Sequence, residues 1–247
     1  MTPGAEPDRD PRRVQKCETV DPLTWLHPST RQLAVVGGIC AIADAVLTIL
    51  NGFVISPGGP GDPNLAAAEI VKSAGGLHER IQLGAFIDAF GVGLLLVFVL
   101  ILGKLAEPEG GLFSSVAAFM AAVFFATDVA WAATEFAFAD ATVRNTDPNA
   151  AKALFLVSQS FLAVIAIPIT LQYVALGLLI FKTRVLHGAL AWFAFVAAAV
   201  ALGSVIATIY SVLDVAGFVA FIVCAILWPL AAGVLLLMRR LPQPLAN

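Results

Sequence analysis

The chain has 247 residues, of which 60% are hydrophobic and 13% are charged, and its formal net charge is −3. Soluble domains are about 25% charged, and they need polar side chains to cover their surface. This composition therefore excludes a soluble globular protein, and the small net charge gives no indication of a nucleic-acid partner. We expect an all-α integral membrane protein that is surrounded by the lipid bilayer.

Residues 1–30 precede the first apolar run and are rich in proline and charge. They are predicted to form a largely disordered arm, and they contain no apolar stretch typical of a cleavable signal peptide. Each later apolar run reaches the roughly 20 residues that a transmembrane helix needs. We predict a six-helix transmembrane domain over residues 31–240 and a short tail at 241–247. The predicted spans are 32–55, 81–103, 112–138, 150–181, 187–210 and 214–238.

The Lys and Arg residues predict the orientation of these spans. If the N-terminus is cytoplasmic, ten of the 14 lie on the cytoplasmic side and four lie outside (10 + 4 = 14). Cytoplasmic loops of membrane proteins carry the excess of positive charge. We therefore expect both termini in the cytoplasm and a multi-pass protein of the cell membrane. The four outer residues are Lys72, Arg80, Arg144 and Lys152.

The longest predicted outer loop, residues 56–80, begins with the turn sequence SPGGPGDPN. The adjoining NLAAAEIVKSA predicts a short helix, with Asp62 as its N-cap and Pro63 at its first position. We expect Gly75 and Gly76 to end this helix before the second span.

The fourth span is also preceded by an Asp-Pro pair, Asp147 and Pro148. No glycine pair interrupts the residues after this pair, so one helix is predicted from Pro148 to Phe181. Such a helix is about 50 Å long at 1.5 Å per residue, which exceeds the hydrocarbon thickness of about 30 Å. It is expected to protrude, tilt or bend, with a kink at Pro168.

The two Asp-Pro-Asn sequences suggest an internal repeat. A shift of 84 residues places Asp44 on Asp128 (128 − 44 = 84) and Asn51 on Glu135. Spans one and two then match spans three and four, as in transporters built from parallel repeats. Chance similarity between alanine-rich helices gives the same pattern, so both interpretations stay open.

Several predicted spans carry acidic residues, and no Lys or Arg lies within the core of any span. Asp44 lies mid-span, Asp88 and Asp128 lie at similar depth, and each shares a helix face with small or polar residues. If these faces converge, they enclose a polar cavity that opens outward. Glu135 and Asp140 are expected to lie near the outer interface, where they can reach water. The candidate cavity residues are Asp44, Asn51, Asp88, Asp128, Glu135, Gln159 and Tyr173.

Acids inside a membrane span indicate a proton or cation pathway, or hydrogen bonds that join helices. The first interpretation predicts a small transporter that is linked to a proton, a cation or a small cationic solute. The alternative is a non-catalytic subunit or assembly factor that binds a membrane-protein partner. A membrane enzyme is the least favoured interpretation, because no nucleophile motif or phosphate-binding loop occurs.

The sequence gives no indication of a cofactor, a metal site or a set of catalytic residues. The histidines His27, His78 and His187 all lie at predicted span ends, whereas a membrane haem needs histidines facing inward from the spans. His78 is expected to be a solvated loop residue. No lysine lies mid-span, which excludes a retinal Schiff base.

The chain resembles uncharacterised six-span integral membrane proteins of actinobacteria. The similarity lies in RQLAVVGGICAIADAVLTIL of the first span, in the outer GDPN sequence and in the terminal LLLMRR. It implies a six-span protein of a bacterial inner membrane, and it assigns no site residues.

Overall fold

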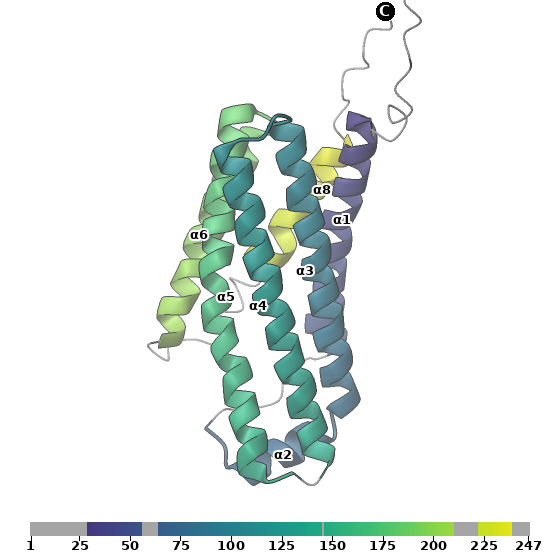
Figure 1. Cartoon of the computed structure of the whole chain (residues 1–247), viewed down its shortest axis with the longest axis vertical. Helices are drawn as coiled ribbons and strands as arrows, with labels where there is room; N and C mark the ends of the chain where they lie inside the picture. The colour runs from purple at the N-terminus through teal and green to yellow at the C-terminus, as the bar shows by residue number, and fades with distance from the viewer. Residues whose placement is uncertain (1–28, 56–63, 145, 210–221, 239–247) are drawn as a thin grey trace, which may run out of the picture.

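The computed structural model describes residues 29–55, 64–144, 146–209 and 222–238, and every regular element among them is a helix (Figure 1). Most of these helices run side by side in an elongated bundle, and α2 lies across one end, which we call the α2 end. In chain order the elements are α1 (Thr30–Leu50), the π-helix η2 (Asn51–Ile55), α2 (Ala67–Gly75), α3 (His78–Ala106), α4 (Leu112–Val143), α5 (Pro148–Thr183), α6 (Gly188–Ile209), the π-helix η3 (Ile222–Leu227) and α8 (Trp228–Met238).

Four helices are long and apolar enough to cross a membrane: α1 together with η2, α3, α4 and α5. Shorter apolar helices cover Gly188–Ser204 and Val223–Met238. Large apolar side chains face outward, among them Phe86 and Phe90 on α3, which stack on each other at the surface. A bundle that presents such side chains all around suits a lipid environment, because lipid replaces water as the surrounding solvent. The predicted all-α class is confirmed, and the apolar helices are compatible with the predicted membrane location.

Small residues allow the helices to approach closely. Where α1 crosses α8, a Cβ atom at Gly233 would lie 2.8 Å from the carbonyl oxygen of Gly38, and one at Gly38 would lie 2.6 Å from Leu237. Both distances are too short for real atoms, and at Gly233 the obstacle is backbone, so a side chain there would force the two helices apart. Such contacts are typical of membrane bundles, because their helices associate by close packing.

The start of the last helix is irregular around Pro229, which has no N–H group to donate. In a π-helix each N–H bonds to the carbonyl five residues earlier, so continuing η3 would need Pro229 to donate to Cys224 (229 − 224 = 5). The hydroxyl group of Tyr173 on α5 donates to the Cys224 carbonyl instead. The Tyr173 ring also packs edge-on against Trp228, with centroids 5.1 Å apart. A side chain from a neighbouring helix thus satisfies the backbone at the proline.

The predicted long fourth span is confirmed by α5, which has 36 residues. The Asp147 side chain accepts a hydrogen bond from the Asn149 N–H at 3.0 Å, and Pro148 occupies the first helical position, as predicted. The helix continues through Pro168 and ends before Arg184, a non-glycine residue with a left-handed backbone (φ 56°). At 1.5 Å per residue α5 is about 54 Å long, so it extends beyond a bilayer core.

The short helix α2 begins later than predicted. Asp62 and Pro63 lie outside the described residues, and the helix starts at Ala67. The Glu69 carboxylate accepts the N–H of Ala66 at 3.2 Å, so an acid inside the first turn caps this helix. Its end at Gly75 is as predicted, and its buried side chains pack with those of α4 and α5. The predicted arm at 1–30, the last turn near residue 212 and the tail also fall largely or wholly outside the described residues.

Candidate functional site

The acids Asp44, Asp88 and Asp128 meet where α3 packs between α1 and α4. The carboxyl groups of Asp88 and Asp128 are hydrogen-bonded to each other, and the Asp44 carboxyl interacts electrostatically with both. Asp44 and Asp128 are each 3% exposed, and Asp88 is half-buried. The structure therefore brings these sequence-predicted residues together into one cluster, which we call the acid cluster.

Asn51 joins the acid cluster from the point where α1 changes into η2. Its side-chain Nδ2 donates to Oδ1 of Asp88 at 3.4 Å, and its backbone N–H bonds to the carbonyls of both Leu47 and Thr48. Short π-helical segments widen a helix by one residue per turn and occur frequently at functional sites. The change of helix type at Asn51 positions a neutral donor beside Asp88.

Gly91 determines how closely α3 approaches Asp44. A Cβ atom at residue 91 would lie 3.3 Å from Oδ1 of Asp44 and 3.7 Å from Cβ of Leu47. The first of these distances is tighter than ordinary packing, so a side chain here would push the carboxyl group or α1 away. The small-residue face that the sequence indicates around Asp88 therefore contacts the acid of the neighbouring helix.

The acid cluster has no basic partner in the part of the chain that the structure describes. The ion pairs among the described residues involve Asp140 and Glu107, and none involves an acid of the cluster. One carboxyl oxygen each of Asp44 and Asp128 is buried without a hydrogen-bond partner among the described residues, as is Oδ1 of Asn51. A hydrogen bond between two carboxyl groups needs a proton on one of them. When this hydrogen bond forms, one carboxyl group of the Asp88–Asp128 pair therefore carries a proton.

Glu135 lies apart from the acid cluster, although it is on the same helix as Asp128. It is only 4% exposed, and its carboxyl group lies beside Ser158 on α5, whose hydroxyl group donates to the Phe155 carbonyl at 2.8 Å. The expectation that Glu135 reaches water is therefore wrong, because α5 covers it. Gln159, the next residue after Ser158, is half-buried.

Two buried polar residues of α5, Ser158 and Gln172, are not among the predicted cavity residues, whereas the predicted Tyr173 is buried. Gln172 is 1% exposed, and its Oε1 has no hydrogen-bond partner among the described residues. Ser158 and Gln172 are 14 residues apart (172 − 158 = 14), which places them on one stripe of the helix at a spacing of seven. Ile165 and Leu179 continue this stripe and are also buried. A count of every seventh residue would have selected Gln172.

Tyr173 is buried beside Gln172, but its hydroxyl group is already committed to the Cys224 carbonyl. Its interaction with Asp44 is electrostatic and involves no hydrogen bond among the described contacts. Tyr173 therefore connects the last helix to the side of the bundle that carries the acid cluster.

Asp140 forms a second polar group at the α2 end. Its Oδ2 lies 2.8 Å from Nη2 of Arg144, and its Oδ1 accepts from Nε2 of Gln82 at 3.1 Å. Nε2 of His78 lies 3.5 Å from the same Oδ1. The description of His78 as a solvated loop residue is wrong, because it is the first residue of α3 and faces α4. No group of three or more His, Cys, Asp or Glu side chains that could hold a metal ion occurs among the described residues.

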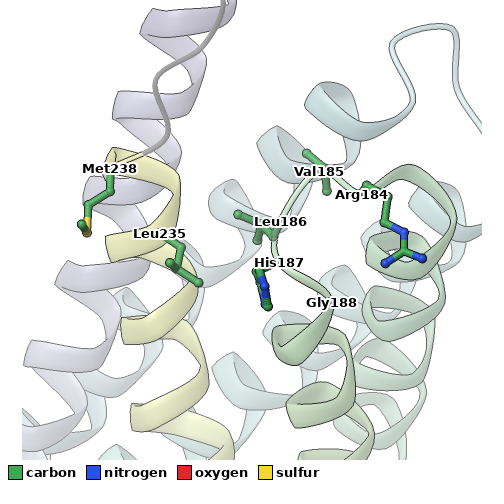
Figure 2. A pocket seen from close by; sticks show the side chains of 7 residues that line it. All are labelled: Arg184, Val185, Leu186, His187, Gly188, Leu235 and Met238. Carbon is green, nitrogen blue, oxygen red and sulfur yellow. The ribbon is translucent and has the colours of Figure 1, made fainter.

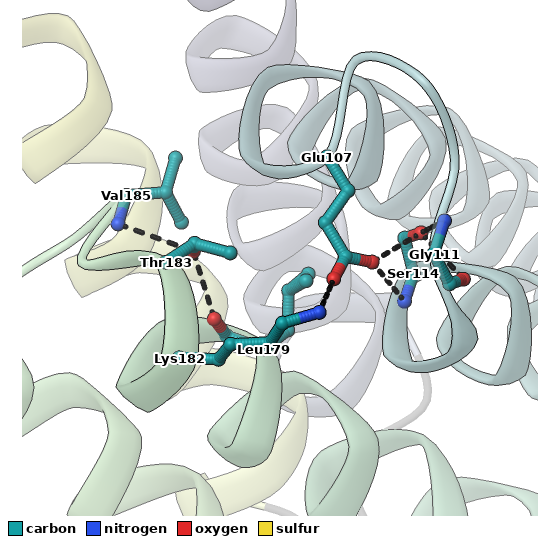
Figure 3. Close-up of polar contacts among 7 residues, drawn as sticks. All are labelled: Glu107, Gly111, Ser114, Leu179, Lys182, Thr183 and Val185. Carbon is teal, nitrogen blue, oxygen red and sulfur yellow. Dashed lines mark hydrogen bonds and ion pairs between the residues drawn. The ribbon is translucent and has the colours of Figure 1, made fainter.

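At the opposite end of the bundle, Glu107 connects two helices through an ion pair and hydrogen bonds (Figure 3). Glu107 is not among the predicted site residues. Its carboxylate accepts Nζ of Lys182 at 2.6 Å, and it accepts the hydroxyl and the N–H of Ser114 at 2.8 and 3.3 Å. The hydrogen bonds from Lys182, and then those from Ser114, lower the pKa of Glu107 below its usual value. This ion pair ties the turn between α3 and α4 to the end of α5.

Comparison of the chain with protein-family models, with curated proteins and with solved structures finds no match.

Proposed function

We propose that the chain is a six-span protein of the cell membrane with both termini in the cytoplasm, and that it is a small transporter linked to a proton or a cation. The orientation rests on the whole sequence, in which ten of the 14 Lys and Arg residues fall in segments assigned to the cytoplasmic side. The other four, Lys72, Arg80, Arg144 and Lys152, belong to the α2 end or the elements beside it, so we assign the α2 end to the outer side.

The observation that carries the functional proposal is the shared hydrogen bond between the carboxyl groups of Asp88 and Asp128 beside the buried Asp44. Three carboxylates this close cannot all be ionised without a compensating charge. Acidic residues within membrane spans usually mark proton or ion pathways, because an ionised group inside the bilayer is energetically unfavourable and is rarely kept without a function.

In this proposal each residue of the acid cluster has a separate role. Asp88 and Asp128 share the exchangeable proton, or together bind a small cation when that proton is lost. Asn51 donates to Asp88 and so holds this carboxyl group in place without adding charge. Asp44, pressed against Gly91, stands beside the pair as a further acceptor. Movement of α3 relative to α1 or α4 would then change the affinity of the pair for its proton.

A first test measures the proton itself. Infrared difference spectra of the purified protein, recorded as the pH is changed, contain a band from each protonated carboxyl group. We expect a band that disappears in Asp128→Asn or Asp88→Asn and persists in Glu109→Gln, a control at an exposed acid in the turn after α3. Identical spectra in wild type and both Asn variants would reject a shared proton.

A second test measures transport. Proteoliposomes that contain a pH-sensitive dye are given a pH gradient, with and without sodium, and the initial rate of proton movement is recorded. We expect Asp44→Asn, Asp88→Asn and Asp128→Asn to slow this movement and Glu109→Gln to leave it unchanged. Wild-type rates in all three variants, together with wild-type melting temperatures, would exclude transport through the acid cluster.

The alternative function is a non-catalytic subunit or assembly factor of a larger membrane complex. The stacked and exposed Phe86 and Phe90 on α3 offer an apolar face for a membrane-protein partner. Purification in a mild detergent distinguishes the alternatives: a partner present in a fixed ratio supports the subunit, and an isolated protein that moves protons supports the transporter.

A further inference from the structure

A groove of about 580 Å³ opens between the α5–α6 connection and the last turns of α8 (Figure 2). It lies at the end of the bundle opposite α2 and away from the acid cluster. Its lining residues are Arg184, Val185, Leu186, His187, Gly188, Leu235 and Met238.

The polar part of the groove offers hydrogen-bond donors and positive charge. Arg184 is exposed and has no ion-pair partner among the described residues, whereas the neighbouring Lys182 is paired with Glu107. Nδ1 of His187 accepts the N–H of Ala189 at 3.2 Å, which leaves the proton of a neutral imidazole on Nε2 as a donor. None of the described residues that line the groove is acidic. An anion with several acceptor oxygens is the complementary ligand.

Arg184 has a backbone conformation that residues other than glycine rarely adopt. Its φ of 56° lies in the left-handed region, where a helix end usually has glycine. The guanidinium group reaches the start of α6, because a Cβ atom at Gly188 would lie 3.4 Å from its Nη1. An arginine in a strained conformation at the mouth of a groove points to a function for its side chain.

The opposite wall of the groove is apolar and exposed. Leu235 is 38% exposed and Met238, the last described residue of α8, is 73% exposed. Trp192, five residues after His187, is 66% exposed on the outside of α6 and packs edge-on against Phe181. Exposed tryptophans of membrane helices lie at the level of the lipid headgroups. Trp192 thus favours the depth of the lipid phosphates for this end of the bundle, where acyl chains would lie beside Leu235 and Met238.

We propose that this groove binds the phosphate headgroup of an anionic phospholipid. Arg184 and His187 bind the phosphate oxygens, and Leu235 and Met238 contact the first part of an acyl chain. Free inorganic phosphate shares the anionic chemistry, but it leaves the apolar wall unused. Basic sites between membrane helices at the cytoplasmic surface are a known mode of lipid binding.

The test measures anisotropy of acyl-labelled phosphatidylglycerol bound to the full-length protein in detergent. Unlabelled phosphatidylglycerol, phosphatidylcholine with the same chains and inorganic phosphate at matched ionic strength serve as competitors. The variant Arg184→Asn removes the charge but tolerates the left-handed backbone. The matched control is Arg80→Asn, at an exposed arginine near the α2 end. Gel filtration and melting temperature verify that both variants are folded.

We expect Arg184→Asn to weaken phosphatidylglycerol binding about tenfold and Arg80→Asn to leave it unchanged. Phosphatidylcholine should compete about tenfold less well than phosphatidylglycerol, and phosphate should not compete. Equal weakening in both variants would show a general attraction to anionic lipid and overturn the site. Equal competition by phosphatidylcholine, or effective competition by phosphate, would overturn the assignment to an anionic lipid headgroup.

Discussion

Tyr173 provides a direct test of how this bundle accommodates a proline. Its hydroxyl group is the donor to the Cys224 carbonyl, which lies five residues before Pro229. Tyr173→Phe removes this donor and keeps the ring that packs against Trp228. A buried acceptor that loses its partner destabilises a protein by about 1–3 kcal/mol, and measured hydrogen bonds between membrane helices reach about 1.7 kcal/mol. We expect Tyr173→Phe to lower the free energy of unfolding by about 1–2 kcal/mol.

If the Tyr173 hydroxyl replaces the donor that Pro229 lacks, the loss of stability in Tyr173→Phe should depend on Pro229. Pro229→Ala restores an N–H group at residue 229, which can bond to the Cys224 carbonyl or to that of Ala225. In the Pro229→Ala background, Tyr173→Phe should therefore lower stability by only about 0.5 kcal/mol or less, giving a coupling of about 1 kcal/mol between the two positions.

Reversible unfolding in mixed detergent micelles, followed by circular dichroism, measures all four proteins of this cycle. A loss of the same size in the wild-type and Pro229→Ala backgrounds would refute the reasoning, since the Tyr173 hydroxyl would then not replace the missing donor. Retained near-ultraviolet signals from Trp228 serve as the control that the ring contact persists.

Further predictions concern the helix ends and the closest crossing. Gly233→Ala should destabilise the bundle by about 1–3 kcal/mol in the same unfolding assay, because its Cβ would lie 2.8 Å from the Gly38 carbonyl oxygen. Asp147→Ala should cost about 1 kcal/mol through loss of the N-cap of α5, and increased amide exchange should be confined to its first turn. Hydrogen bonds, first of all from Lys182, lower the pKa of Glu107 below its usual value of 4.5. The ionised carboxylate therefore stabilises the fold fully above pH 4.5, and this stabilisation is lost as the pH falls through the lowered pKa. The difference in melting temperature between wild type and Glu107→Gln should therefore be largest near neutral pH and disappear in acid.

Much of the fold follows from patterns that are local in the sequence. Asp147 and Pro148 predict the start of α5 because a cap needs only neighbouring residues. The start of α2 was misplaced because the acid that caps it, Glu69, lies inside the helix and not before it. The predicted kink at Pro168 does not interrupt α5. The number of spans and their orientation depend on charge rules that act on the whole membrane, and they stay predictions.

Helical spacing in the sequence predicts part of the acid cluster but not all of its geometry. Spacing places Asp88 and Gly91 on one face, and the structure turns that face toward Asp44. It does not show that Asn51 begins a π-helix, because the irregular turn depends on packing against α3. Its position near the end of the span predicts that Glu135 reaches water, but α5 packs over it and buries its side chain. The repeat that pairs Asp44 with Asp128 also stays a prediction.

The two described π-helical segments share a location that bears on function. Segment η2 supplies Asn51 to Asp88, and η3 supplies the carbonyl that binds Tyr173, whose hydroxyl also interacts with Asp44. Within a membrane, irregular backbone is tolerated only where protein or a polar cavity satisfies it. Both irregular segments contact α1, the helix that carries Asp44, and η2 also contacts α3. Polar side chains and irregular helix geometry therefore occur together around α1, an arrangement that favours the proposed proton or cation site.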